Sequence, residues 1–363
     1  MAYYEKRIKR LQALLAKLDL DGLLVADGYN MRYLTGFTGG TGDGLVIVTK
    51  DGAALITDDR YRGIYQNNLP DGVAFEVTRD YFGQAVQSLI KAGVHKLGFE
   101  ASMAYRDFEL LDEILPADID FDAVPDAIET LREVKDEVEM DALRRAAHAS
   151  VQAFNDLLNF IKVGQTELEV ANELDRLQKK YGAEKPSFDT IVASGYRSAL
   201  PHGAATDKVI EKGDLVTIDF GYYVDGYTSD VTRTIAMGDI DPKLEEIYQI
   251  VLQANKDAIA MVKPGVSTDE IDRVARDYIS EHGYGEYYNH ATGHGAGLYI
   301  HEGPVLRTND GEEVLAGNLL TIEPGIYLPD LGGVRIEDDV LVTPEGHENL
   351  TAGIDKNLIK IEA

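Results

Sequence analysis

Apolar residues recur at helical and strand spacing in alternation along the first third of the chain. The opening stretch, MAYYEKRIKRLQALLAKLDLDG, has Leu and Ile at helical spacing and predicts an amphipathic helix that ends near Asp21-Gly22. Short apolar runs follow, among them LVIVT and AALIT, which are separated by a turn at Asp51-Gly52. Further helix–strand pairs continue through AVQSLIKAG and KLGFE. This alternation predicts a smaller α/β domain over residues 1–128.

The pattern changes in residues 129–363, where we predict a second, α+β domain. Its first element is a heavily charged helix, expected to run unbroken from Glu129 to Ile161. Two segments then match at an interval of 101 positions, GQTELEV at 164–170 and GVSTDEI at 265–271. Each begins a helix with a Ser/Thr cap, and each helix closes at a glycine. Two helix–helix–strand units in tandem are therefore predicted.

The stretch LVTIDFGYYVDGYTSDVTRTIAM, residues 215–237, predicts a β-hairpin around the turn dipeptide Asp225-Gly226. In that register Asp219 faces Thr232, and Asp230 faces Gly221. Asp219 and Asp230 then share one face as diagonal neighbours, roughly 7–8 Å apart at the backbone, with Gly221 leaving space between them. Two like charges in so apolar a strand pair are costly unless a cation neutralises them.

The corresponding stretch of the second unit, LLTIEPGIYLPDLGGVRIEDDVLVT, predicts two strand-like runs that carry Glu323 and Glu337. Its longer loop leaves the register open, so the two glutamates share a face only if they pair in even register. His202 and His301 occupy similar places, each just before its hairpin. A duplicated unit folded about a pseudo-twofold axis brings the two hairpins together, with four carboxylates around one cavity.

Four such carboxylates and a histidine form an oxygen-rich ligand set. His294 is the expected fifth ligand, because Gly293 and Gly295 let the backbone approach closely. Two divalent ions would balance the charge, and bridging carboxylates hold such ions about 3.5–4 Å apart in two-metal hydrolases. This ligand type favours Mn²⁺ over a structural zinc. Each acidic residue taken singly is more often a surface charge, and only the combined set points to a metal site.

Composition narrows the range of partners. The 363 residues carry a net charge of −28, which argues against nucleic acid and anionic membrane as binding partners. The chain has no cysteine, so disulfides, thiolate ligands and cysteine nucleophiles are excluded. No signal-peptide pattern opens the chain, and no apolar run approaches the length of a membrane span. We expect a cytoplasmic protein.

The sequence resembles the pita-bread metallopeptidases, which include methionine aminopeptidase, aminopeptidase P and prolidase. The first 128 residues resemble the creatinase-like N-terminal domain of the proline-specific members, including TGFTG and TDDRY. The second domain, 129–363, resembles the pita-bread catalytic domain. The matching segments there are ALPHG at 199–203, DFG at 219–221, SDVTRT at 229–234, TGHG at 292–295, HEGP at 301–304, EPGIY at 323–327 and GVRIED at 333–338.

The resemblance implies a role for each site residue. One ion would be held by Asp219, Asp230 and Glu337, and the other by Asp230, His294, Glu323 and Glu337. Mn²⁺ is the expected metal, with Co²⁺ or Zn²⁺ as alternatives. Glu323 would also act as general base. Substrate binding is implied for His202, His301 and Arg335. The two histidines would also take part in catalysis. Arg335 and Thr232 would orient the carboxylates. A homodimer is a further implication.

The substrates implied are peptides with proline at the second position. Their Xaa-Pro bond is a tertiary amide without an N–H, so a dedicated pocket is expected, with Phe188, Tyr222 and Tyr299 as candidate walls. Ala291 stands where some relatives carry Arg before Thr-Gly-His, and this favours an aminopeptidase P over the alternative, an Xaa-Pro dipeptidase (prolidase). A creatinase-like hydrolase without metal and a non-catalytic peptide-binding relative are more remote alternatives, because all five ligands are present.

Overall fold

The computed structural model describes residues 2–309 and 311–362, which form two compact units, Met1–Arg132 and Glu133–Ala363. The predicted boundary after residue 128 lies at the start of α6 (Glu129–Glu133), the helix in which this division falls. Each unit has its own sheet structure and its own apolar core, and each is described by itself.

The first unit is a six-stranded mixed sheet in the order β4-β3-β2-β1-β5-β6, flanked by helices. Its core joins side chains of β1, β2, β3 and β5 to α4 and α5. Every residue of β1 and β3 is buried, which explains why these runs read as uninterrupted apolar segments. The elements are α1 (Ala2–Lys17), β1 (Gly22–Val25), α2 (Gly28–Thr35), β2 (Gly44–Thr49), β3 (Ala53–Thr57), the 3₁₀ turn η1 (Asp59–Tyr61), α3 (Arg62–Tyr65), β4 (Val73–Val77), α4 (Tyr81–Lys91), β5 (Lys96–Glu100), α5 (Tyr105–Ile114) and β6 (Asp120–Val124).

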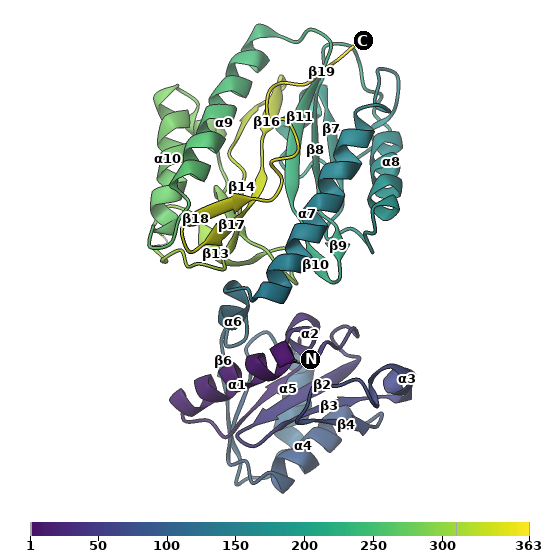
Figure 1. The fold of residues 1–363 in the computed structure, drawn as a ribbon, viewed down its shortest axis with the longest axis vertical. Helices are drawn as coiled ribbons and strands as arrows, with labels where there is room; N and C mark the ends of the chain where they lie inside the picture. Colours follow the sequence, from purple (N-terminus) through teal and green to yellow (C-terminus); the bar gives the residue numbers. More distant parts are fainter. Residues whose placement is uncertain (1, 310, 363) are drawn as a thin grey trace. The chain divides into compact units, whose positions relative to one another are not determined.

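The second unit repeats one order of elements, two helices followed by three main strands. The first repeat contains α7 (Glu137–Leu157), α8 (Glu167–Lys180), β7 (Ile191–Ser194), β8 (Leu215–Phe220) and β11 (Val231–Met237). The second contains α9 (Pro242–Met261), α10 (Thr268–Glu281), β12 (Gly293–Gly295), β14 (Leu319–Ile322) and β17 (Asp338–Thr343). In this unit α7 lies beside α8, and α9 lies beside α10 on the other side of the strands (Figure 1). The duplication predicted from the sequence is confirmed.

Shorter elements complete the second unit. The two sheets have the orders β19-β11-β8-β7 and β13-β12-β14-β17-β18, and two further strand pairs, β9-β10 and β15-β16, extend the hairpins. These elements are η2 (Gly195–Ala199), β9 (Tyr223–Val224), β10 (Tyr227–Thr228), η3 (Gly285–Tyr287), β13 (Glu302–Leu306), β15 (Gly325–Leu328), β16 (Gly332–Arg335), β18 (Gly346–Asn349) and β19 (Lys360–Ile361).

The repeated helices begin and end as their sequences predict. Thr166 and Ser267 cap α8 and α10, and each forms a capping box with the glutamate three residues later. Gly182 and Gly283 follow these helices with φ values of 96° and 87°, a left-handed conformation that glycine adopts without strain. Local chemistry therefore sets the ends of both helices.

Both hairpins keep one register through a break, and Asp230, Glu323 and Glu337 lie in these breaks. In the first, Asp219 pairs with Thr232 and Val224 with Tyr227, as predicted, although the ladder is interrupted between Phe220 and Tyr223. In the second, Leu319 pairs with Leu341 and Gly325 with Arg335, so an unchanged register through the break sets Glu323 opposite Glu337. The question that the loop length left open is thereby answered.

Two details of the prediction are wrong. Gly221 leaves no open space, because a Cβ there would lie 2.5 Å from Ser187 Oγ and 2.4 Å from the carbonyl oxygen of Ser229. The charged helix from Glu129 is not continuous either. It is divided into α6 and α7, because the side chain of Asp136 accepts the backbone N–H groups of Val138 and Glu139 and starts a new helix.

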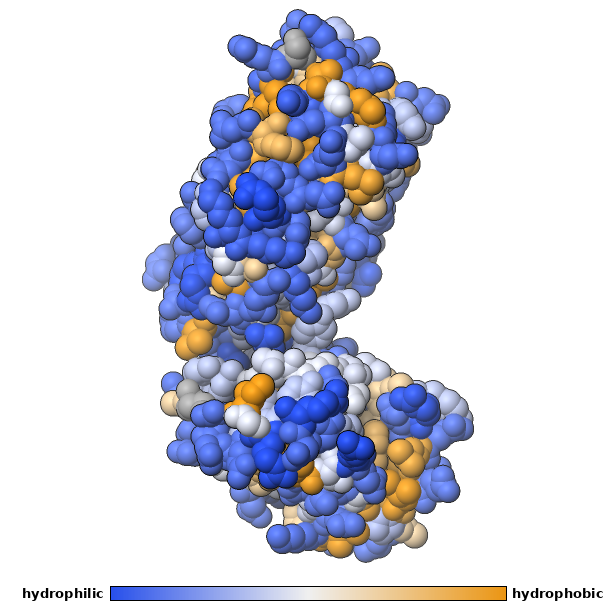
Figure 2. Space-filling view, turned by 90° about the vertical axis from the view of Figure 1, so that its right-hand side faces the viewer, coloured by the Kyte–Doolittle hydropathy of each residue, from blue (hydrophilic) through white to orange (hydrophobic). Residues whose placement is uncertain are grey.

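Hydrophilic side chains dominate the face of the molecule drawn in Figure 2, with apolar groups scattered among them. This is in keeping with the 27% of charged residues in the sequence. Among residues 2–309 and 311–362, no helix has both the length and the apolar character that crossing a bilayer requires.

Candidate metal centre

The eight residues predicted as metal ligands, catalytic groups or substrate-binding groups all line a single cavity of about 640 Å³ in the second unit. They come from both repeats and from the loops that precede their hairpins. These residues are His202, Asp219, Asp230, His294, His301, Glu323, Arg335 and Glu337.

Three of the acidic side chains converge closely enough to share an ion. Asp219, Asp230 and Glu337 each offer a carboxylate oxygen, and these three oxygens lie within 4.8 Å of one another. All three residues are buried. Asp219 belongs to β8, whereas Asp230 and Glu337 lie directly before β11 and β17, where each hairpin is broken. The breaks therefore turn carboxylates from both repeats toward one point.

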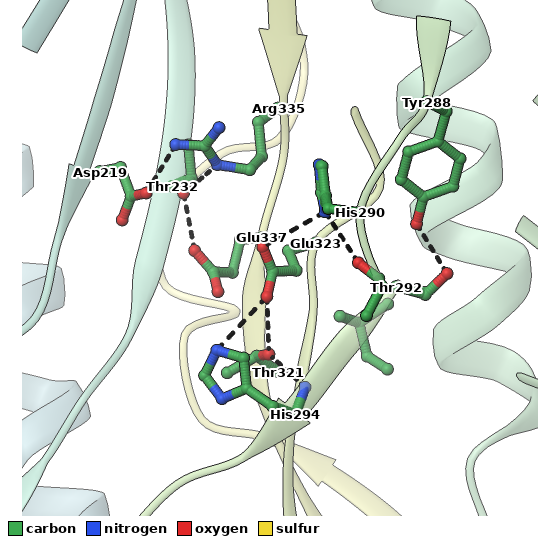
Figure 3. Close-up of polar contacts among 12 residues, drawn as sticks. Asp219, Thr232, Tyr288, His290, Thr292, His294, Thr321, Glu323, Arg335 and Glu337 are labelled. Carbon is green, nitrogen blue, oxygen red and sulfur yellow. Dashed lines mark hydrogen bonds and ion pairs between the residues drawn. The ribbon is translucent and has the colours of Figure 1, made fainter. Parts of the chain in front are cut away.

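His294 and Glu323 lie beside this cluster (Figure 3). The Nε2 atom of His294 is 3.4 Å from Glu323 Oε1 and 3.7 Å from Asp230 Oδ2. Its Nδ1 atom lies 3.0 Å from the carbonyl oxygen of Gly295, an arrangement that assigns the ring proton to Nδ1 and leaves the Nε2 lone pair directed at the carboxylates. Burial also lowers the pKa of His294. A neutral imidazole in this orientation can coordinate a metal ion through Nε2.

The electrostatics of the cluster fit bound cations. Burial, together with repulsion from Glu337 and Asp219, raises the pKa of Asp230 well above its ordinary value. Burial and repulsion from Glu323 and Asp219 do the same to the pKa of Glu337. The Oδ1 atom of Asp219 is buried and has no hydrogen-bond partner. Four carboxylates, one of which has an unpaired oxygen in Asp219 Oδ1, and one neutral imidazole form a ligand set that suits two divalent ions preferring oxygen ligands.

A second set of side chains holds the cluster in place. The Nη2 atom of Arg335 lies 2.6 Å from Asp219 Oδ2, and its Nε donates to Thr232 Oγ over 3.2 Å. Thr232 Oγ donates in turn to Glu337 Oε2 over 2.6 Å. These contacts place Arg335 and Thr232 where they orient two of the carboxylates (Figure 3).

Three residues of the site were not predicted from the sequence. His290 Nε2 lies 2.9 Å from Tyr327 Oη, and Arg335 Nη1 donates to the same hydroxyl over 2.8 Å. Both His290 and Tyr327 line the cavity. His290 stands four positions before His294, and this close spacing of two histidines could have indicated it as a site residue. Asp339 accepts the backbone N–H of Asp230 over 2.9 Å, and burial raises its pKa to about 8.

The predicted pocket walls are correct in one case of three. Phe188 lines the cavity. Tyr222 instead belongs to the apolar core, 1% exposed, with its hydroxyl 3.4 Å from Asp175 Oδ1. Tyr299 is 41% exposed and is not among the residues that line the cavity. Alternation along the strands could not reveal this, because the ladder is interrupted just before Tyr222.

The charge of the cluster predicts how stability depends on pH and metal. Folding raises the pKa of these carboxyl groups when no metal is bound. The metal-free fold is therefore least disfavoured by them below their ordinary pKa of about 4, where they are protonated, and it loses stability as pH rises through the raised values. We therefore expect the gap in melting temperature between metal-loaded and metal-free protein to widen from about pH 5 to pH 8. Calorimetry with manganese or with a chelator measures this gap, and a gap that stays constant or narrows would contradict the expectation.

Two family models match this chain. The family model described as metallopeptidase family M24 matches residues 141–344, and that of the creatinase/prolidase N-terminal domain matches 7–134. The chain is 41% identical over 354 residues to the Xaa-Pro dipeptidase of Pyrococcus horikoshii, covering 97% of this chain and 98% of the relative.

Two solved structures extend the comparison. An Xaa-Pro dipeptidase from Bacillus anthracis is 42% identical, with a TM-score of 0.94 over 98% of this chain and 99% of that one. An X-Pro aminopeptidase from Thermotoga maritima is 34% identical, with a TM-score of 0.88 over 98% and 99% of the two chains. With a pita-bread fold and a buried acidic centre, the chain belongs to metallopeptidase family M24 and carries the creatinase/prolidase N-terminal domain.

Proposed function

We propose that this protein is an Xaa-Pro dipeptidase that depends on two divalent metal ions. The observation that carries the proposal is the single cavity in which Asp219, Asp230, Glu337, Glu323 and His294 converge. The sequence alone favoured an aminopeptidase P. The similarity to dipeptidases, at 41% and 42% identity against 34% for the aminopeptidase, supports the alternative better. Manganese as the metal, assembly as a homodimer and a cytoplasmic location remain predictions.

The residues of the cavity divide the work of hydrolysis. The acidic cluster and His294 would hold two divalent ions, whose chemistry when bound would be Lewis-acid polarisation of a carbonyl and acidification of a water molecule. Glu323 would take the proton of that water, and its Oε1 atom is held by the hydroxyl of Thr321 at 3.3 Å. Thr321 Oγ also accepts the backbone N–H of His294 over 3.0 Å, so one side chain aligns the base and the ligand.

Binding of the substrate would use both polar and apolar walls of the cavity. The imidazoles of His202 and His301 lie at its exposed edge and would donate to the substrate carbonyl and carboxylate oxygens. Burial lowers the pKa of His301, so it would act mainly as a neutral hydrogen-bond donor. Phe188, Ala291 and Pro329 form apolar lining against which a proline ring can pack, and no wall has to accept an N–H from the tertiary amide.

A matched set of peptides tests the proposal. Metal-loaded protein is expected to cleave Ala-Pro with a kcat/KM about tenfold or more above that for Ala-Pro-Ala, and to leave Ala-Ala largely intact. Liberated proline or amino-terminal alanine is measured by chromatography. Preference for the tripeptide would instead indicate an aminopeptidase P. Hydrolysis that persists in a chelator would indicate a metal-independent hydrolase, and no cleavage of any peptide by metal-loaded protein would indicate a binding protein.

A further inference from the structure

A lysine and a glutamate form an ion pair in the interior of the second unit. Lys135 Nζ lies 3.1 Å from Glu302 Oε2, and the two side chains are only 1% and 5% exposed. Lys135 belongs to the short segment that divides α6 from α7, and its backbone N–H donates to the carbonyl of Gly317 over 2.9 Å. The interruption of the helix thus places this ammonium group inside the domain.

Glu302 is the first residue of β13, and its side chain bonds back to the loop that joins β12 to β13. Its Oε1 atom accepts the backbone N–H of Tyr299 over 3.0 Å, while its Oε2 atom meets Lys135. The carboxylate also lies against the backbone of Gly297, where an added Cβ would come within 2.6 Å of Oε2. Oε1 therefore holds the tight loop of residues 297–302 from within, and Oε2 ties that loop to Lys135.

That loop carries His301, which lines the cavity. Its ring contacts the ring of His294 edge-on, with centroids 4.6 Å apart and planes inclined at 72°. Glu302 is the next residue in the chain, so a shift of its carboxylate moves the backbone that supports the imidazole. Lys135 itself is not among the cavity-lining residues, and its side chain reaches the site through Glu302.

We propose that Lys135 and Glu302 are positioning residues that hold His301 in its working place. This role rests on the function proposed above, in which His301 contacts the substrate. Apolar residues can often replace a buried ion pair with little loss of stability, whereas removing one partner leaves an uncompensated charge. Glu302 bonds the backbone of the His301 loop through Oε1 and Lys135 through Oε2, so the pair has a geometric role that apolar packing would not reproduce.

The test uses a thermodynamic cycle with His301. Lys135→Met with Glu302→Gln removes both charges together and retains an acceptor for Tyr299, which limits the risk of unfolding. We expect this double variant to lower kcat about 10- to 100-fold on Ala-Pro while metal affinity is unchanged. In a His301→Ala background the same two substitutions should cost almost nothing further. Lys208→Met, which breaks a Lys–Asp pair away from the cavity, is the control and should retain kcat.

A second readout does not depend on hydrolysis. The imidazole NMR signals of His301, assigned with His301→Ala, should shift or broaden in the charge-free variant, while those of the exposed residues His95 and His148 stay unchanged. Wild-type His301 signals in the folded variant, or catalytic losses that add to those of His301→Ala, would overturn the inference. If no peptide is cleaved by the parent protein, the proposed function fails, and the NMR comparison still decides whether the pair positions the ring.

Discussion

Replacing Asp230 with Asn is expected to abolish most hydrolysis and yet to stabilise the metal-free protein. Asp230 lies between Asp219 and Glu337, with His294 Nε2 only 3.7 Å from its Oδ2. Its pKa is raised by burial first and then by the neighbouring carboxylates, so its charge is unfavourable when no cation is bound. The amide removes that charge with little change of shape, and the melting temperature in a chelator should rise.

The same substitution removes a carboxylate that both ions are expected to share. Metal catalysis contributes several kcal/mol to transition-state stabilisation, so kcat/KM should fall about 10³-fold or more. The rise in melting temperature on adding manganese should shrink as well. Calorimetry with and without metal, together with peptide cleavage, measures both effects.

Asp156→Asn provides the matched control for this experiment. The substitution removes one carboxylate charge, as Asp230→Asn does, but at a partly exposed residue that pairs with Lys180 at 2.8 Å. It should change neither metal response nor activity, because surface pairs contribute little. A metal-free Asp230→Asn protein that melts below the parent, and still responds fully to metal, would show that the cluster is not strained by its own charge.

Replacing Asp338 with Asn is expected to lower the free energy of unfolding by about 3–5 kcal/mol. Asp338 is fully buried and directs its Oδ1 atom to Arg233 Nη2 at 2.9 Å and its Oδ2 atom to Lys356 Nζ at 3.0 Å. Although burial acts to raise the pKa of Asp338, these two cations hold it at about 2. Arg233 is itself 1% exposed, so the asparagine leaves a buried guanidinium without its counter-charge.

This pair joins the two repeats, because Arg233 belongs to β11 and Asp338 to β17. A carboxyl whose pKa is lowered by folding contributes stability above its ordinary value of about 4, and that contribution is lost as pH falls toward 2. The deficit of the variant should therefore be complete near pH 7 and shrink below about pH 4. Urea unfolding at a series of pH values measures it.

Asp239→Asn is the control for this second substitution. Asp239 is fully exposed and lies 4.0 Å from Lys360, so the same chemical change should be almost neutral there. A loss below about 1 kcal/mol for Asp338→Asn, equal to that of the control, would mean that the buried pair does not hold the repeats together.

Several features of this fold followed from local chemistry that a sequence displays. The capping boxes at Thr166 and Ser267 set the starts of two helices, because the residues involved are only three positions apart. The two-residue turn at Asp225-Gly226 determined the register of the first hairpin, since so short a loop allows few alternatives. The four carboxylates could be predicted for a related reason, because they stand at corresponding places in the two hairpins, whereas His294 was predicted from its flanking glycines.

Other features depended on contacts between residues far apart in the chain. The longer loop of the second hairpin did not determine its register, which is set by the strand pairing on both sides of the break, within a hairpin whose strands are buried on both faces. The division of α6 from α7 brings Lys135 to Glu302, a partner 167 positions away. Asp339 and His290 joined the site only because folding brought them against Asp230 and Tyr327.

Caps, turns and repeated motifs act over a few residues, so the duplicated plan and the residues expected at the centre could be predicted from the sequence. The tertiary structure decided how the acidic groups converge, which walls surround them and which ion pairs are buried. The physical reason is that desolvation and mutual repulsion of charges depend on what each side chain is packed against, and no short segment contains that information.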